Sequence, residues 1–172
     1  YTTLFRSLSV RGIVSVSDSA DTTTGGIVGI NHGTLINCQF TGVVTGDSEV
    51  GGIVGRNESE GTIDHSTARA IVTGKSSTGG IAGYNLGAIT GCTNVGSINT
   101  EYQEASLDTD GFTAKMVDQI NNKMAAADDD ATNSVTNVAT DTGGIAGRSS
   151  GMILTSVNTG TVGYEQDRKS VV

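Results

Sequence analysis

The sequence contains no proline and no tryptophan, and its 25 glycines do not recur at every third residue. A glycine-rich chain without that three-residue period is not a collagen-like triple helix. Isoleucine and valine recur at regular intervals, which excludes a disordered low-complexity chain. Short aliphatic runs separated by glycine, serine and threonine predict many short strands joined by tight turns.

Basic residues are few and do not cluster. The chain has 10 lysines and arginines against 18 aspartates and glutamates, a formal net charge of −8. An acidic surface repels phosphate backbones, so we expect no nucleic-acid partner. No run of about 18 apolar residues occurs either, so we expect no contact with a membrane in this stretch of chain.

Both ends of the chain resemble translated sequencing-adapter sequence. Residues 1–7 are the translation of TACACGACGCTCTTCCGATCT, and residues 167–172 are the translation of GATCGGAAGAGCGTCGTG. Segments of such origin carry no information about a fold. We therefore expect residues 1–7 and 167–172 to be non-native scars outside every repeat column. The real protein would be residues 8–166, a metagenomic fragment truncated on both sides.

A motif of five residues, Gly-Gly-Ile-Val/Ala-Gly, occurs four times, with starts 26, 28 and 64 residues apart. Such a period indicates stacked units that share one core. The intervals predict a coil of 26 residues, extended by two residues in the second coil and by 38 in the third. The repeat columns contain Gly25, Gly26, Ile27, Asn31, Gly33, Gly51, Gly52, Ile53, Asn57, Gly61, Gly79, Gly80, Ile81, Asn85, Gly87, Gly143, Gly144, Ile145 and Gly151.

Each column has a physical requirement if coils stack at about 4.8 Å. The aliphatic columns would form a continuous interior, and one coil alone has too few of them to fold. The glycine columns suit corners where φ is positive or where backbones approach closely. The asparagine column suits a left-handed turn whose side-chain amides are hydrogen-bonded from coil to coil. A β-sandwich would not require this column-by-column identity, so we predict an all-β fold, a parallel β-solenoid.

The repeat resembles the GLUG motif family of bacterial secreted and cell-surface proteins. The resemblance rests on Gly-Gly-Ile-Val/Ala-Gly-x-Asn-x-Gly-x-Ile-x-x-Cys/Ser and a following Gly-x-Val, and it covers most of residues 8–162. It implies a β-helical repeat of a large extracellular protein. Some family members carry the repeat beside a metallopeptidase domain that cleaves immunoglobulin A.

Residues 99–142 interrupt the third coil with a different composition. Apolar residues at helical spacing predict one amphipathic helix within residues 111–127. Its stripe would either cover part of the solenoid as a lid or contact a partner, because insertions of repeat proteins gather on one face. The candidate partner contacts are Phe112, Met116, Ile120 and Met124.

The cysteines share one column, yet Cys38 and Cys92 are separated by a coil that carries Ser66 at the same place. Two coil spacings, about 10 Å, are too long for a disulfide, so we expect two free buried thiols. Neither thiol has a second ligand at the short spacing that zinc requires, and we expect no metal and no cofactor.

The titratable side chains form no recognisable catalytic set. His32 and His65 occupy unrelated places in their coils, without a His-Glu-x-x-His zinc motif. Glu58 and Glu60 lie in the two-residue extension, and no basic partner is expected for them. We therefore expect no catalytic residue and no enzyme activity in this chain.

These features together predict a non-catalytic structural or interaction module, either a rigid stalk or an adhesin-like segment. Its location would be extracellular or at the cell surface. Its partners would be the rest of its own longer chain and a host or bacterial surface protein or glycan. The alternatives are a non-catalytic arm of a larger extracellular enzyme, such as a metallopeptidase that cleaves immunoglobulin A, and a glycan-processing β-helix.

Overall fold

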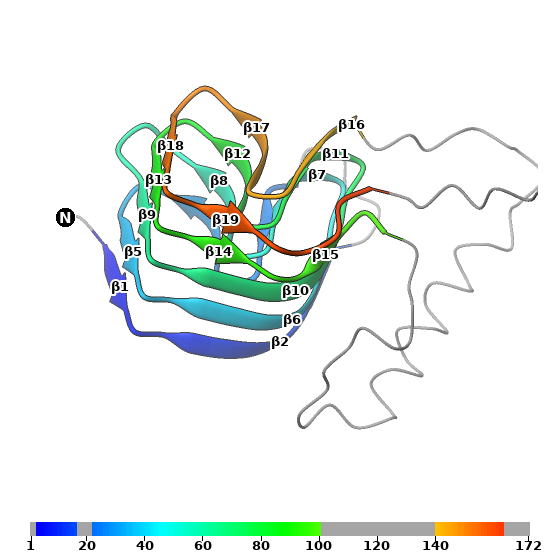
Figure 1. Ribbon diagram of the computed structural model, residues 1–172, viewed down its shortest axis with the longest axis horizontal. Coiled ribbons are helices and arrows are strands. Elements are labelled where there is room, and N and C mark those ends of the chain that lie inside the picture. The colour runs from blue at the N-terminus through cyan, green and yellow to red at the C-terminus, as the bar shows by residue number, and fades with distance from the viewer. Residues whose placement is uncertain (1–2, 17–21, 101–139, 164–172) are drawn as a thin grey trace, which may run out of the picture. The chain divides into compact units, whose positions relative to one another are not determined.

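The computed structural model describes residues 3–16, 22–100 and 140–163, and within them every regular element is a β-strand. All the strand pairs are parallel, and each strand pairs with the equivalent strand of the next coil. The predicted all-β parallel solenoid is therefore confirmed (Figure 1). Within the same residues no helix is long and apolar enough to cross a membrane.

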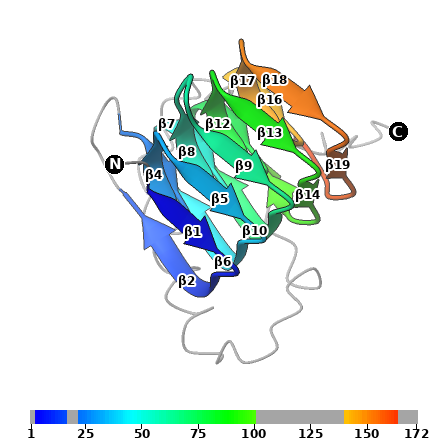
Figure 2. The ribbon, with the colours of Figure 1, turned by 90° about the vertical axis from the view of Figure 1, so that its left-hand side faces the viewer.

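Four parallel sheets form the sides of the solenoid. Sheet A contains β1 (Leu4–Arg6), β5 (Thr34–Ile36), β9 (Thr62–Asp64), β13 (Ala88–Thr90) and β18 (Met152–Leu154), which lie side by side in Figure 2. Sheet B contains β2 (Ser9–Ser15), β6 (Gln39–Thr45), β10 (Thr67–Thr73), β14 (Thr93–Asn94), β15 (Ser97–Ile98) and β19 (Val157–Asn158).

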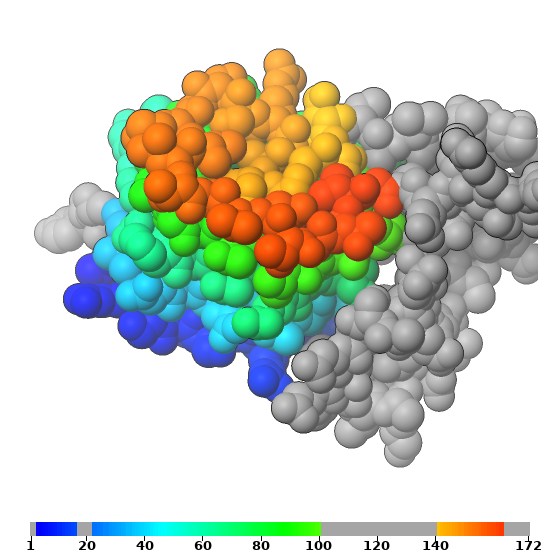
Figure 3. All heavy atoms as spheres, in the orientation of Figure 1, coloured from blue at the N-terminus to red at the C-terminus, as the bar shows by residue number. Residues whose placement is uncertain are grey.

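The other two sheets have shorter strands. Sheet C contains β3 (Thr24–Gly25), β7 (Ser48–Gly51), β11 (Ser76–Gly79) and β16 (Thr140–Gly143). Sheet D contains β4 (Val28–Asn31), β8 (Val54–Asn57), β12 (Ala82–Asn85) and β17 (Ala146–Ser149). The coils appear in Figure 3 as successive layers from the first strands, in blue, to the last, in orange.

The aliphatic columns have the predicted register and form the core. Leu35 lies beside Ile63, Ile63 beside Ile89, and Ile89 beside Ile153. The first three of these side chains are fully buried. Ile153 belongs to the last described coil and is 39% exposed, because no further described coil covers it. Burial of a column side chain therefore depends on the next coil, as the repeat interpretation requires.

The second glycine of each Gly-Gly pair is required by close packing across the interior. A Cβ atom at Gly26 would lie 2.5 Å from the Phe40 ring, and one at Gly52 would lie 2.9 Å from Cβ of Ala68. Neither glycine has a positive φ. Of the two reasons expected for the glycine columns, close approach is the one that applies to these pairs.

The beginning of the chain differs from the prediction that residues 1–7 occupy no repeat column. Strand β1 pairs with β5, and Phe5 lies in register with Leu35. Ser7 donates its backbone N–H to the Ile36 carbonyl at 2.9 Å. The reason is geometric. Without β1, strand β5 would be an edge strand, and its unpaired backbone N–H and C=O groups can pair with any extended segment at this point of the chain.

The coil continues regularly on both sides of the insertion. Asn99 donates its backbone N–H to the Val72 carbonyl at 2.8 Å, and Thr140 pairs in register with Ser76. These two ends of the predicted 99–142 insertion therefore belong to the solenoid. The predicted helix, with Phe112, Met116, Ile120 and Met124, lies outside the described residues.

Candidate functional site

A ladder of buried side-chain amides runs through sheet D. Asn31 Nδ2 donates to Asn57 Oδ1 at 2.8 Å, and Asn57 Nδ2 donates to Asn85 Oδ1 at 2.8 Å. Asn85 Nδ2 donates to Ser149 Oγ at 3.1 Å. The predicted bonding of amides from coil to coil is confirmed. A chain of such bonds in a low-dielectric interior polarises its members, so each bond strengthens the next.

The backbone conformation predicted for the asparagine column is wrong, because none of its members has a positive φ. The left-handed residues of this side of the coil come just before the cysteine column, at Ser7, Asn37, His65, Gly91 and Thr155. There the chain turns from sheet A into sheet B. Asn31 instead closes its own turn, accepting the Gly33 N–H at 3.1 Å and donating to the Gly33 carbonyl at 3.1 Å.

A second ladder runs through the cysteine column. The backbone N–H of Cys38 donates to Ser66 Oγ at 3.1 Å, that of Ser66 to Cys92 Sγ at 3.4 Å, and that of Cys92 to Ser156 Oγ at 3.2 Å. Both cysteines are free and buried, which confirms the predicted thiol state. Serine and cysteine alternate in this column because either side chain can accept the bond.

Burial raises the pKa of the Cys92 thiol from 9.0 to about 11. The hydrogen bond from the Ser66 N–H lowers this pKa, and the negative charge of Asp64 raises it. Between pH 9.0 and about 11 this thiol is ionised in the unfolded chain, whereas in the folded protein it stays protonated. Its contribution to stability is therefore complete below pH 9.0 and is lost between pH 9.0 and about 11.

We predict that Cys92→Ser reduces the loss of stability between pH 9 and 11. The thiol should account for up to about 3 kcal/mol of that loss. Denaturant unfolding of wild type and variant at pH 8 and pH 11 measures the difference. Serine already occupies this column in neighbouring coils, so the variant should fold normally at pH 8. An identical pH dependence in both proteins would contradict the prediction.

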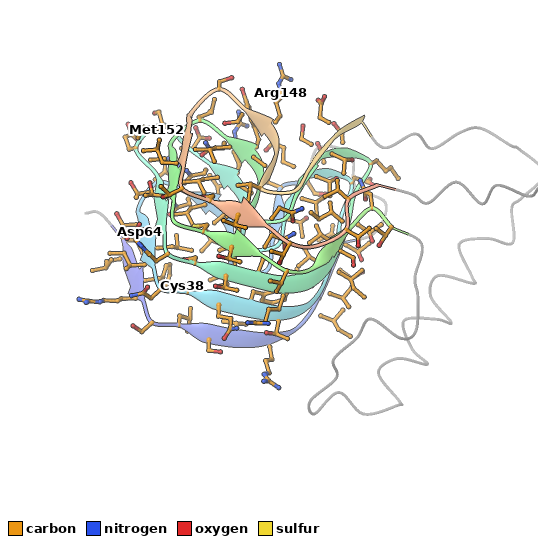
Figure 4. The ribbon with its side chains drawn as sticks, viewed as in Figure 1. Cys38, Asp64, Arg148 and Met152 are labelled. Carbon is orange, nitrogen blue, oxygen red and sulfur yellow. The ribbon has the colours of Figure 1, made fainter. Side chains whose placement is uncertain are left out.

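An outward column on sheet D joins three coils by cation–π contacts. Arg56, Tyr84 and Arg148 lie in register on β8, β12 and β17. The Arg56 and Arg148 guanidinium carbons lie 5.3 and 5.5 Å from the centroid of the Tyr84 ring. Figure 4 shows Arg148 projecting outward from its strand. Such contacts contribute about 0.5–1 kcal/mol each at exposed sites, so this column stabilises the stacking of coils.

The acidic residues of the two-residue extension have basic partners, contrary to the prediction. Glu58 pairs with Arg56 at 3.1 Å, and Glu60 pairs with His32 at 3.7 Å. The sequence did not indicate these pairs: His32 and Glu60 meet only when the coils stack, and the contact between Arg56 and Glu58 depends on the path of the two-residue extension. His65 lies at the corner between sheets A and B and pairs with Asp64 at 2.8 Å. Within the described ranges no group of three or more His, Cys, Asp or Glu side chains could hold a metal ion.

One ladder was missed. Asn94 Nδ2 donates to Asn158 Oδ1 at 2.7 Å on the inner side of sheet B. The signal was present, because the two residues are 64 positions apart, as are the Gly-Gly pairs that flank the insertion. It was hidden because the same column holds Phe40 and Ala68 in the preceding coils.

The ladders and the parallel sheets define the chain as a repeat protein of the parallel β-solenoid class. Residues 46–73, which span β7 to β10, match the GLUG motif. The other coils repeat the columns of that segment, so the resemblance to the GLUG motif family is confirmed. No curated protein and no solved structure matches it.

Proposed function

We propose that this chain is a non-catalytic structural and interaction module, a rigid stalk or adhesin-like segment of a bacterial secreted or cell-surface protein. The observation that carries the proposal is the continuity of the ladders. The asparagine ladder crosses coil intervals of 26, 28 and 64 residues with donor–acceptor distances of 2.8, 2.8 and 3.1 Å. A scaffold that keeps its geometry across insertions of different length is suited to spacing and display.

The test is to lengthen the solenoid by one coil. A copy of residues 46–73 inserted after Thr73 should pair on both sides and lengthen the stack by about 4.8 Å. Its melting temperature should not fall, because the stability of a repeat array is a sum over coils and their interfaces. Small-angle scattering measures the length, and circular dichroism measures the melting temperature.

The matched control carries a glycine/serine segment of the same length at the same position. It should form a loop and leave the length of the stack unchanged. A duplicated coil that behaves like this control, or that unfolds the protein, would contradict the stalk role. Cleavage of immunoglobulin A or of a polysaccharide by the purified chain would contradict the non-catalytic role.

A further inference from the structure

The outward side of sheet B is free of carboxylates over the part of the chain that the structure describes. Along β2, β6 and β10 the inward residues alternate with outward ones, which are serine, threonine, glutamine, valine, isoleucine and arginine. The described carboxylates lie elsewhere: Asp47, Glu49, Glu58, Glu60, Asp64 and Asp141. In a chain with a net charge of −8, this distribution leaves one broad face without negative charge.

Arginine supplies positive charge on the same face. Arg69 is exposed on β10, and Arg11 lies in the same column on β2, with Thr41 of β6 between them. Two strand spacings separate the arginines by about 10 Å. Because Arg11 already has an interaction of its own, Arg69 is the main candidate for binding. A guanidinium recognises a carboxylate through two parallel N–H···O bonds.

The rest of the face is rich in neutral hydrogen-bonding groups. Thr67 lies two residues before Arg69 on β10, and Gln39 and Thr41 of β6 pair with Thr67 and Arg69. All three neighbours are partly exposed. Nucleic acids draw affinity from many cation–phosphate contacts and from aromatic stacking, and this face has few cations and no aromatic side chain among its described outward residues. Hydroxyl and amide groups around sparse arginines suit a ligand with many hydroxyls and spaced carboxylates.

We infer that the outward face of sheet B binds a linear acidic polysaccharide, with Arg69 holding a carboxylate and the neighbouring hydroxyls and amide pairing with sugar hydroxyls. This inference rests on the interaction role proposed above and names its ligand class. The repulsion from the net negative charge is screened beyond about 8 Å at physiological ionic strength, so contacts at the face decide the binding.

Affinity electrophoresis in gels that contain polygalacturonate tests the inference. The protein should be retarded by polygalacturonate and not by its methyl ester, which has the same backbone without charged carboxylates. Arg69→Gln should weaken binding about ten-fold or more, because a charge-assisted contact is lost. Thr67→Glu should abolish binding, because it places a carboxylate two residues from Arg69 on the same face.

Two matched variants change the same charge on other faces. Arg148→Gln on sheet D and Thr62→Glu on sheet A should bind like wild type, and circular dichroism should show all four variants folded. Absence of retardation, equal weakening by Arg148→Gln, or equal retardation by DNA would overturn the inference. None of these outcomes affects the elongation expected from coil duplication, so failure of the ligand assignment and failure of the stalk role are distinguishable.

Discussion

Replacement of Asn57 by alanine is expected to lower the free energy of unfolding by about 2–6 kcal/mol. Asn57 is fully buried between two coils, where it accepts from Asn31 Nδ2 and donates to Asn85 Oδ1. Alanine would leave a buried donor on one side and a buried acceptor on the other without these partners. Each unsatisfied buried group costs about 1–3 kcal/mol. Denaturant unfolding followed by circular dichroism measures the loss.

Asn57→Ser is the control for side-chain volume. Serine takes this column position at Ser149, where it accepts from Asn85 at 3.1 Å. The serine variant should therefore recover part of the ladder and lose less than half as much stability as the alanine variant. Equal losses for both variants would show that packing, and not the amide ladder, dominates at this position.

Replacement of Phe40 by alanine is expected to cost about 3–5 kcal/mol, the range for a fully buried phenylalanine. Among the described residues Phe40 is the largest fully buried side chain, and its ring lies against Gly26 across the interior. Alanine fits the backbone of this column, since Ala68 occupies the next coil in register. The loss therefore comes from the cavity and not from strain. Thermal and denaturant unfolding measure it.

Phe5→Ala is the matched control, because Phe5 lies in a strand of the first described coil and is 39% exposed. It should cost less than half of the loss at Phe40, since partial burial contributes proportionally less. Similar losses at both positions would contradict the assignment of the core to the interior of the coil stack.

The solenoid could be predicted because its defining features are properties of columns. The recurrence of Asn31, Asn57 and Asn85 at fixed offsets from Gly-Gly already specified which residues lie beside each other. Parallel in-register stacking follows from that recurrence, since only stacked equivalent coils bring equivalent residues together. The amide ladder and the free thiols followed from the same register.

Features that depend on the cross-section of one coil could not be predicted. The sequence does not indicate that Phe40 lies opposite Gly26, because this contact joins two sides of the coil that no periodicity relates. The same limit hid the pairing of Glu58 with Arg56, which depends on the path of the two-residue extension. The left-handed corner at His65 was missed because five different residue types occupy that column, from Ser7 to Thr155.

The ladders also give the stack a sense of direction. Asn31 donates toward Asn57, and Asn94 toward Asn158, so in both the side-chain amide of one coil bonds to an oxygen of a later coil. The backbone N–H of Cys38 donates to Ser66 in the same sense. A further coil in the same orientation would therefore present an acceptor to each donor below it, whereas an inverted coil would set donor against donor.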